Sequence, residues 1–344
     1  MIPMVRKLGL ALIFLTSMLC SRSSAWAQDV SGLFLDDPDV SYPLSFQLTY
    51  LEDPVGTLTL HEITQPEKSV QFRPINQAFP NFGITESTYW FQFQVFNDTN
   101  HESWRLAFNN ARIGMIDLFV SEADGSGWLH QRAGTYLPAA TWAYAYPHIV
   151  FPLLLKNSSE TTIYLRVESN LPLRLTPSLW SERAFEQHQQ AFYGFIGLFY
   201  GGIILMAIYN LVIYLMVRKI TYLYYFLFSL FCVLNAATSD GTALLFLYPG
   251  IALKHAIYGS ATLFMVFLAL LMQNFLELKV RLPWINRLIF GLVSLQVLSF
   301  VVYVFYPPVF ALGSVIVISY AVLAILASIL VWRKGLRRAA YFLT

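Results

Sequence analysis

Charged residues and cysteines are scarce in this sequence. Asp, Glu, Lys and Arg make up 12% of its 344 residues, and hydrophobic residues make up 56%, whereas soluble domains average about 25% charged and 45–50% apolar residues. The net charge is +2, and the basic residues are scattered or lie beside apolar runs, so they form no stripe that would bind nucleic acid. This composition excludes an ordinary soluble domain, and we expect no nucleic-acid partner.

The motifs of common catalytic sites are also missing. The sequence has no G-x-S-x-G, Walker loop, H-E-x-x-H or dinucleotide fingerprint, and its histidines include no pair at a metal-ligand spacing such as H-x-x-x-H. We therefore predict no enzyme within these residues, no metal and no cofactor. His188 and His255 flank predicted membrane spans on the outer side, where a pH-sensing role is the alternative to ordinary solvated histidines.

The first residues are typical of an export signal. Arg6 and Lys7 precede an apolar stretch at 8–19, and Ala25-Trp26-Ala27 is a cleavage site of the A-x-A type. The alternative, an uncleaved anchor helix, would need a longer apolar stretch. We predict a signal peptide at 1–27, which would remove Cys20 and leave Cys232 as the only cysteine. The exported part would then have no disulfide and would depend on a packed core.

Residues 28–180 are predicted to form an all-β sandwich or jelly roll outside the membrane. In residues 89–96 aromatic and aliphatic side chains alternate between two faces, as in a strand with one buried side. Further short runs bounded by turn residues lie at 104–109, 115–120, 148–155 and 162–168. The turn residues at 123–127 predict a hairpin between 115–120 and 128–132.

One aromatic segment of this domain is the candidate ligand-binding site. Its residues Trp142, Tyr144, Tyr146 and His148 alternate with Ala143, Ala145, Pro147 and Ile149. If the segment is extended, these rings line one face and would stack on a sugar or pack on an apolar ligand. The alternative is that they fill the core or pack a loop. Trp90, on the opposite strand face from Tyr89, is a further candidate.

The second half, residues 192–344, is predicted to be a helical membrane domain. Five apolar runs have about the length needed to cross a bilayer core: 192–217, 222–237, 255–276, 284–305 and 309–332. Arg and Lys cluster in the connections after the first and third runs and after the fifth, so the positive-inside rule places the N-terminal domain on the outer side. A sixth run starts at 339–344.

The first span is predicted to contact another helix. Four glycines and an asparagine mark its contact face: Gly194, Gly197, Gly201, Gly202 and Asn210. Asn235, Gln273, Asn274 and Gln296 are polar in or near other spans, and we expect them to bond across helices rather than to line a substrate path. Ser181 can cap a helix, and residues 181–191 contain no Gly or Pro, which predicts a rigid helical connector between the two halves.

The order and spacing of these segments resemble one family, the bacterial seven-transmembrane receptors with diverse intracellular signalling modules and a type 2 extracellular domain. The segments that carry the resemblance are Gly83-Ile84-Thr85-Glu86-Ser87-Thr88-Tyr89-Trp90-Phe91, Ile116-Asp117-Leu118-Phe119-Val120, Val150-Phe151-Pro152-Leu153, Ile163-Tyr164-Leu165-Arg166-Val167-Glu168-Ser169, Tyr200-Gly201-Gly202, Tyr209-Asn210-Leu211-Val212-Ile213-Tyr214-Leu215, Tyr222-Leu223-Tyr224-Tyr225 and Arg338-Ala339-Ala340-Tyr341-Phe342-Leu343. The resemblance implies a jelly-roll sensor similar to carbohydrate-binding modules, which controls a cytoplasmic output such as a diguanylate cyclase, a histidine kinase or a phosphatase.

The resemblance also implies seven spans, so the chain is expected to be C-terminally truncated, with a natural five-span end as the alternative. We expect a sensory receptor of the bacterial inner membrane with a periplasmic N-terminal domain. Its expected partners are an external small-molecule or carbohydrate ligand and a cytoplasmic signalling module in cis or in trans, with a homodimer as a further option. The main alternative is a transporter or envelope-assembly subunit whose exported domain captures substrate. A binding module attached to the membrane is a third interpretation.

Overall fold

A computed structural model describes residues 32–122, 127–245, 251–306 and 309–333. The predicted signal peptide at 1–27 and the predicted start of a sixth span at 339–344 lie outside these residues.

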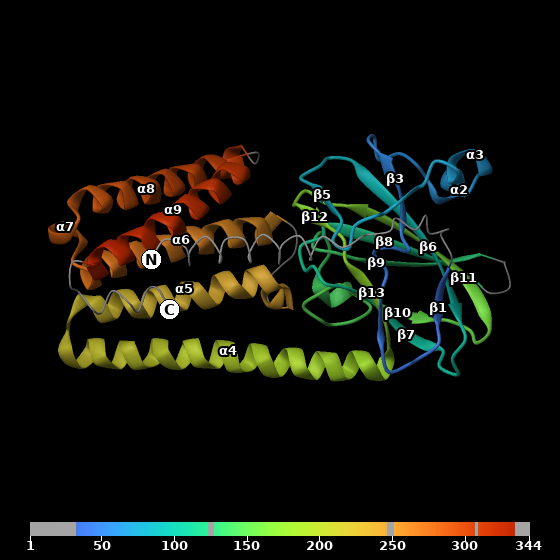
Figure 1. Cartoon of the computed structure of the whole chain (residues 1–344), viewed down its shortest axis with the longest axis horizontal. Coiled ribbons are helices and arrows are strands. Elements are labelled where there is room, and N and C mark those ends of the chain that lie inside the picture. Colours follow the sequence, from blue (N-terminus) through green and yellow to red (C-terminus); the bar gives the residue numbers. More distant parts are fainter. Residues whose placement is uncertain (1–31, 123–126, 246–250, 307–308, 334–344) are drawn as a thin grey trace, which may run out of the picture. The chain divides into compact units, whose positions relative to one another are not determined.

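Two main β-sheets and one short strand pair form the described part of the N-terminal domain (Figure 1). The larger sheet contains β1 (Leu33–Leu35), β3 (Thr49–Asp53), β4 (Arg73–Pro74), β6 (Thr88–Asn97), β8 (Met115–Ser121), β9 (Trp128–Ala133) and β11 (Ser159–Glu168). The smaller sheet contains β2 (Ser41–Pro43), β7 (Ser103–Phe108), β10 (Val150–Leu154) and β13 (Pro177–Ser181). A short pair is formed by β5 (Asn81–Gly83) and β12 (Leu173–Arg174).

In the larger sheet the strand order is β4-β3-β6-β11-β8-β9, and β1 pairs in parallel with the C-terminal end of β6. The long strands β6 and β11 form its centre, with Phe93 opposite Ile163 and Phe91 opposite Leu165. The predicted hairpin between β8 and β9 is confirmed by antiparallel pairing from Ile116 to Ser121. In the smaller sheet the order is β10-β7-β13-β2.

The core of the domain lies between the two sheets. The larger sheet contributes Phe91, Phe93, Ile163 and Leu165, and the smaller sheet contributes Trp104, Leu106, Phe151 and Leu179, all nearly or fully buried. On its other face, the larger sheet is partly covered by the short helix α2 (Leu60–Ile63), where Ile63 packs with Trp90 and Tyr164. The short helix α3 (Pro66–Ser69) follows and has no buried residue. As the alternation of residues 89–96 predicted, Tyr89, Phe91, Phe93 and Val95 form a fully buried face of β6. On the other face of residues 89–96 only Trp90 is buried, under α2, and the residues that follow it on that face are partly exposed.

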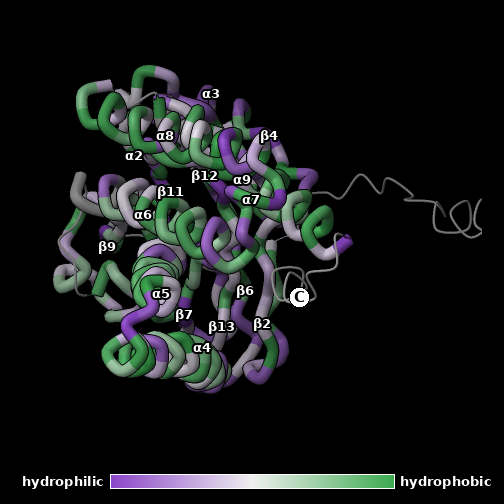
Figure 2. The backbone as a smooth tube through the Cα atoms, turned by 90° about the vertical axis from the view of Figure 1, so that its left-hand side faces the viewer, coloured by the Kyte–Doolittle hydropathy of each residue, from purple (hydrophilic) through white to green (hydrophobic). Residues whose placement is uncertain are grey.

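In the described part of the chain, five long helices follow the sandwich. They are α4 (Glu182–Val217), α5 (Ile220–Asp240), α6 (Ile251–Phe275), α8 (Pro283–Phe305) and α9 (Phe310–Arg333), with the short α7 (Leu278–Arg281) between α6 and α8. Each of the five is long and apolar enough to cross a membrane, and hydrophobic residues dominate them (Figure 2). Neighbours in the chain pack together, α4 on α5, α5 on α6 and α8 on α9, and α6 also packs on α8. The predicted fold class, an all-β domain followed by a helical transmembrane domain, is confirmed.

Helix α4 begins directly where β13 ends. Ser181, the predicted cap residue, accepts a hydrogen bond from the backbone nitrogen of Ala184 at 3.2 Å, and the helix then continues for 36 residues to Val217. At 1.5 Å per residue its length is about 54 Å, compared with about 30 Å for a bilayer core. A single helix thus connects the smaller sheet to the membrane region.

Candidate functional site

The aromatic segment singled out in the sequence does not form a strand. It lies between a short 3-10 turn, η1 (Ala139–Thr141), and strand β10. Trp142 is 7% exposed and belongs to the sandwich core, and its indole nitrogen is buried with no hydrogen-bond partner among the described residues. Tyr146 is 1% exposed. The four side chains therefore do not share one open face.

Tyr146 packs against the first turns of α4. Its ring lies 5.4 Å from Phe185, 5.4 Å from Phe192 and 5.8 Å from Tyr193, measured between ring centroids. Burial raises the pKa of Tyr146, so its phenol stays protonated at neutral pH. We call this contact between residues 142–148 and α4 the joint.

Tyr144 adds polar contacts to the joint. Its hydroxyl donates a hydrogen bond of 2.8 Å to Oε1 of Gln189 on α4. Its ring lies below the guanidinium of Arg105, 5.6 Å from the ring centroid, and Arg105 in turn forms an ion pair with Glu182 in the first turn of α4. These contacts tie both the loop and β7 to the start of the helix.

His148 lies between α4 and the end of α5. Its ring packs on Phe192 at 5.3 Å. Burial lowers the pKa of His148, the charge of Asp240 opposes this shift, and the neighbouring His188 reinforces it. The segment thus faces two membrane helices.

The end of α5 also contacts the sandwich closely. Gly241 has a φ of +88°, and a Cβ at this position would lie 2.3 Å from the carbonyl oxygen of Pro147 and 2.4 Å from Cβ of Ala111. Nε of Arg112 donates to the carbonyl of Ser239 at 3.2 Å. Only a glycine lets the chain approach the loop this closely.

Trp90 lies away from the joint, on the face of the larger sheet that α2 covers. It is 1% exposed and stacks on Phe119 at 5.9 Å. It is therefore a packing residue of that layer in this structure.

The predicted contact face of α4 is open in the structure. A Cβ added to Gly194, Gly197, Gly201 or Gly202 would have no atom within 4 Å, so no described helix lies against them. Asn210 is buried, and its amide donates to the carbonyl of Met206 in the same helix at 2.8 Å.

Three of the four other polar residues that were predicted to bond across helices do so. Asn235 donates to Ser260 at 3.3 Å, Gln296 to Thr262 at 3.3 Å, and Gln273 to Asn286 at 2.9 Å. Asn274 instead bonds to the carbonyl of Leu270 in its own helix. Three of these amides thus join neighbouring helices.

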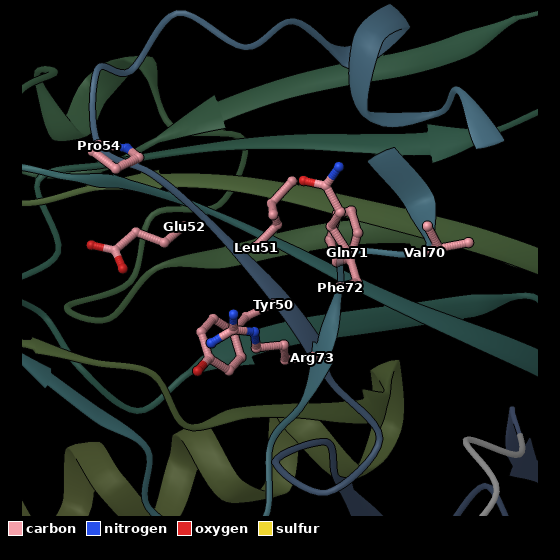
Figure 3. A pocket seen from close by; sticks show the side chains of 8 residues that line it. All are labelled: Tyr50, Leu51, Glu52, Pro54, Val70, Gln71, Phe72 and Arg73. Atoms are coloured by element: carbon pink, nitrogen blue, oxygen red, sulfur yellow. The ribbon is translucent and has the colours of Figure 1, made fainter. Parts of the chain in front are cut away.

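A pocket that the sequence analysis missed lies at one end of the larger sheet (Figure 3). Its volume is about 560 Å³, and it is lined by Tyr50, Leu51, Glu52, Pro54, Val70, Gln71, Phe72 and Arg73. A second hollow of about 400 Å³ shares Tyr50 and extends towards Phe82. The pocket arises from the pairing of β3 with β4, strands about 20 residues apart, and a local sequence pattern gave no signal for it.

The described residues include no group of three or more His, Cys, Asp or Glu placed to hold a metal ion. A cluster of charged side chains lies on the larger sheet, where the buried Asp117 accepts hydrogen bonds from His130 at 3.0 Å and Arg132 at 2.5 Å. Arg166 lies 3.4 Å from the same carboxylate. The negative charge of Asp117 is thus paired with basic side chains of the same domain, which is typical of a structural cluster.

Comparison with known proteins gives two matches to family models. Residues 45–181 match the model described as 7TMR-DISM extracellular 2, and residues 192–344 match the model described as 7TM diverse intracellular signalling. Among solved structures, the chain is similar to a glycoside hydrolase family 43 arabinoxylan arabinofuranohydrolase from Bacillus subtilis in complex with cellotetraose. The sequence identity is 12% and the TM-score 0.21, over 46% of this chain and 30% of the hydrolase chain. No curated protein matches the chain.

Proposed function

Because the chain belongs to the seven-transmembrane receptors with diverse intracellular signalling modules and has their type 2 extracellular domain, we propose that its β-sandwich binds an external small molecule or carbohydrate. The spans then pass the signal to a cytoplasmic module. That module, in cis or in trans, performs the enzymatic output.

The chain is a multi-pass membrane protein with its N-terminal domain on the periplasmic side. Among the described residues, five helices are able to span the membrane, and the connections after α4 and α6 contain Arg218, Lys219, Lys279 and Arg281. Basic residues favour the cytoplasmic side, and the sandwich precedes α4 on the opposite side. A ligand outside and an output inside are therefore separated by the spans.

The observation that carries the proposal is the packing of Tyr146 on α4. Because α4 is one helix from Glu182 to Val217, a shift of the loop at Tyr146 moves the outer end of the first span directly. The contact of Gly241 with Pro147 gives the second span a connection to the same loop. A ligand acts on this system only if it binds one arrangement of the joint more tightly than the other.

The test measures a distance across the joint in the full chain, reconstituted in lipid nanodiscs. Exposed positions on either side of the joint, Ala143→Cys and Glu186→Cys, are spin-labelled in a background that carries Cys20→Ser and Cys232→Ser, and the distance distribution is recorded with panels of amino acids, peptides and oligosaccharides. At least one compound is expected to shift the distribution. The variant Tyr146→Ala is expected to reduce this shift while the compound still binds.

Two controls separate this function from its alternatives. Phe34→Ala, an exposed ring on β1 that is 61% exposed, should leave both binding and the shift unchanged. The same chain in sealed vesicles should show no flux of the bound compound. Ligand flux would contradict the receptor function and favour a transporter, and binding that never changes the joint would contradict signalling through it.

A further inference from the structure

The pocket beside Tyr50 lies along an open strand edge. Strand β4 pairs only with Thr49 and Tyr50 of β3, so the outer edge of β3 at Leu51 and Glu52 has no neighbouring strand among the described residues. A free strand edge offers backbone donors and acceptors to an extended ligand, which is how peptides add to sheets. The pocket therefore has main-chain groups as well as side chains with which to hold a ligand.

The ring of Tyr50 forms an aromatic wall of the pocket and is held in place by neighbouring rings. The ring is half-buried, packs edge-on against Phe82 at 5.4 Å and lies 6.5 Å from Tyr89. These contacts fix the ring while part of it faces the pocket. An apolar group of a ligand can pack on such a ring at little entropic cost.

Two opposite charges lie beside this wall. Arg73 is directly opposite Tyr50 in the strand register, and Glu52 is two residues further along β3, so the two are diagonal neighbours with a separation of about 7–8 Å between their Cα atoms. In Figure 3 their side chains lie on the same side of β3 as Tyr50, whereas Leu51 and Phe72 lie on the other side. Both charged side chains are exposed.

Glu52 is held in place by neighbours that leave part of it available. Its Oε1 accepts hydrogen bonds from the hydroxyls of Ser87 at 2.7 Å and Tyr89 at 3.0 Å. Burial and the bond to Glu52 raise the pKa of Tyr89, so the phenol remains a donor. The described residues place no hydrogen bond on Oε2, and they form no ion pair with Glu52 or with Arg73.

A ligand with a positive and a negative end would satisfy both charges. A neutral sugar could hydrogen-bond to both side chains but would neutralise neither charge, and an acidic sugar would pair with Arg73 but be repelled by Glu52. We propose that this pocket binds a zwitterionic amino acid or dipeptide, with its ammonium at Glu52, its carboxylate at Arg73 and an apolar side chain against Tyr50. This assignment rests on the receptor function, since it names the class of ligand that the receptor senses.

The test compares one dipeptide with its capped forms on the full chain in nanodiscs, by calorimetry. Alanyl-phenylalanine is expected to bind, and N-acetylation or C-terminal amidation is each expected to weaken binding about tenfold, because each removes one charge-assisted contact. Glu52→Gln should weaken binding of the free dipeptide but leave binding of the N-acetylated form little changed. Arg73→Gln should likewise weaken binding of the free dipeptide but leave binding of the C-terminal amide little changed.

Trp128→Ala, at the opposite edge of the same sheet, is the matched control and should not alter binding. Equal binding of the dipeptide and its capped forms, stronger binding of maltose, or no binding of the dipeptide would each overturn the proposal. The distance measurement across the spin-labelled joint distinguishes failure of the amino-acid site from failure of the proposed receptor function. A disaccharide that shifts the joint would support the receptor and overturn the amino-acid site, whereas a dipeptide bound through Glu52 and Arg73 with no shift would support the site and contradict the receptor.

Discussion

The hydroxyl of Tyr144 donates a 2.8 Å hydrogen bond to Oε1 of Gln189, and this bond ties a loop of the sandwich to the helix that enters the membrane. A neutral hydrogen bond of this kind stabilises a fold by about 1 kcal/mol. Because the ring of Tyr144 also lies below Arg105, the hydroxyl and the ring can be tested separately.

Tyr144→Phe is expected to lower the free energy of unfolding by about 1 kcal/mol, since it removes the hydroxyl and keeps the ring. In a double-mutant cycle with Gln189→Ala, the coupling energy should be about 0.5–1.5 kcal/mol. The measurement is denaturant unfolding of the full chain in nanodiscs. Additive effects of the two substitutions would show that the bond contributes nothing.

Tyr146 should respond differently from Tyr144. Its hydroxyl is buried without a hydrogen-bond partner among the described residues, so Tyr146→Phe removes an unsatisfied group and should be neutral or stabilising by up to about 1 kcal/mol. Tyr146→Ala should destabilise by about 3 kcal/mol or more, because it removes a ring packed on Phe185 and Phe192. Thermal unfolding of both variants checks this, and a loss of stability in Tyr146→Phe would reveal a hydrogen bond to that hydroxyl.

Gly241→Ala is expected to separate the end of α5 from the sandwich. A Cβ at this position would clash with Pro147, and the left-handed backbone alone costs about 1–2 kcal/mol for a residue other than glycine. The control is Gly197→Ala, which meets open space in the structure and replaces a helix-interior glycine, so it should be neutral or stabilising by about 0.5–1 kcal/mol. The readout is protease sensitivity of the 142–148 loop, and similar cleavage of both variants would argue against the close approach.

Acid should weaken the joint through His148. Burial lowers the pKa of His148 in the folded chain, so the folded state favours the neutral imidazole. The contribution of His148 to folding stability is therefore fully present above the ordinary pKa of about 6.5 and is lost as the pH falls through the lowered pKa. Between pH 7.5 and 5, the midpoint of thermal unfolding should fall less in His148→Phe than in the unmodified chain. His61→Gln, at an exposed position, should retain the original dependence, and an unchanged dependence in His148→Phe would assign it to another group.

The main architecture could be predicted from the sequence because it is set by local patterns. The alternation of residues 89–96 predicted β6, and the five apolar runs predicted the five long helices, since lipid requires long uninterrupted apolar segments. Both patterns extend over the length of one element. They need no knowledge of what lies against it.

The joint and the pocket could not be predicted in this way because distant segments form them. The alternation of Trp142, Tyr144 and Tyr146 resembled that of an extended strand, but these rings point to different neighbours, Trp142 into the core and the two tyrosines towards α4. Likewise, Tyr50 and Arg73 are adjacent only because β4 pairs with β3. The open face at Gly197 shows the same limit, since the small-residue spacing predicts a contact but does not identify its partner.

The continuity of α4 also determines the amplitude with which motion reaches the cytoplasm. A rigid rod of about 54 Å that tilts by about 5° about its outer end moves its inner end sideways by about 5 Å, about half the diameter of a helix. A rotation of the sandwich by a few degrees would therefore be enough to change the side-chain neighbours around Val217. Transmission of the signal would therefore depend on the stiffness of this helix and would not require a large rearrangement of the periplasmic domain.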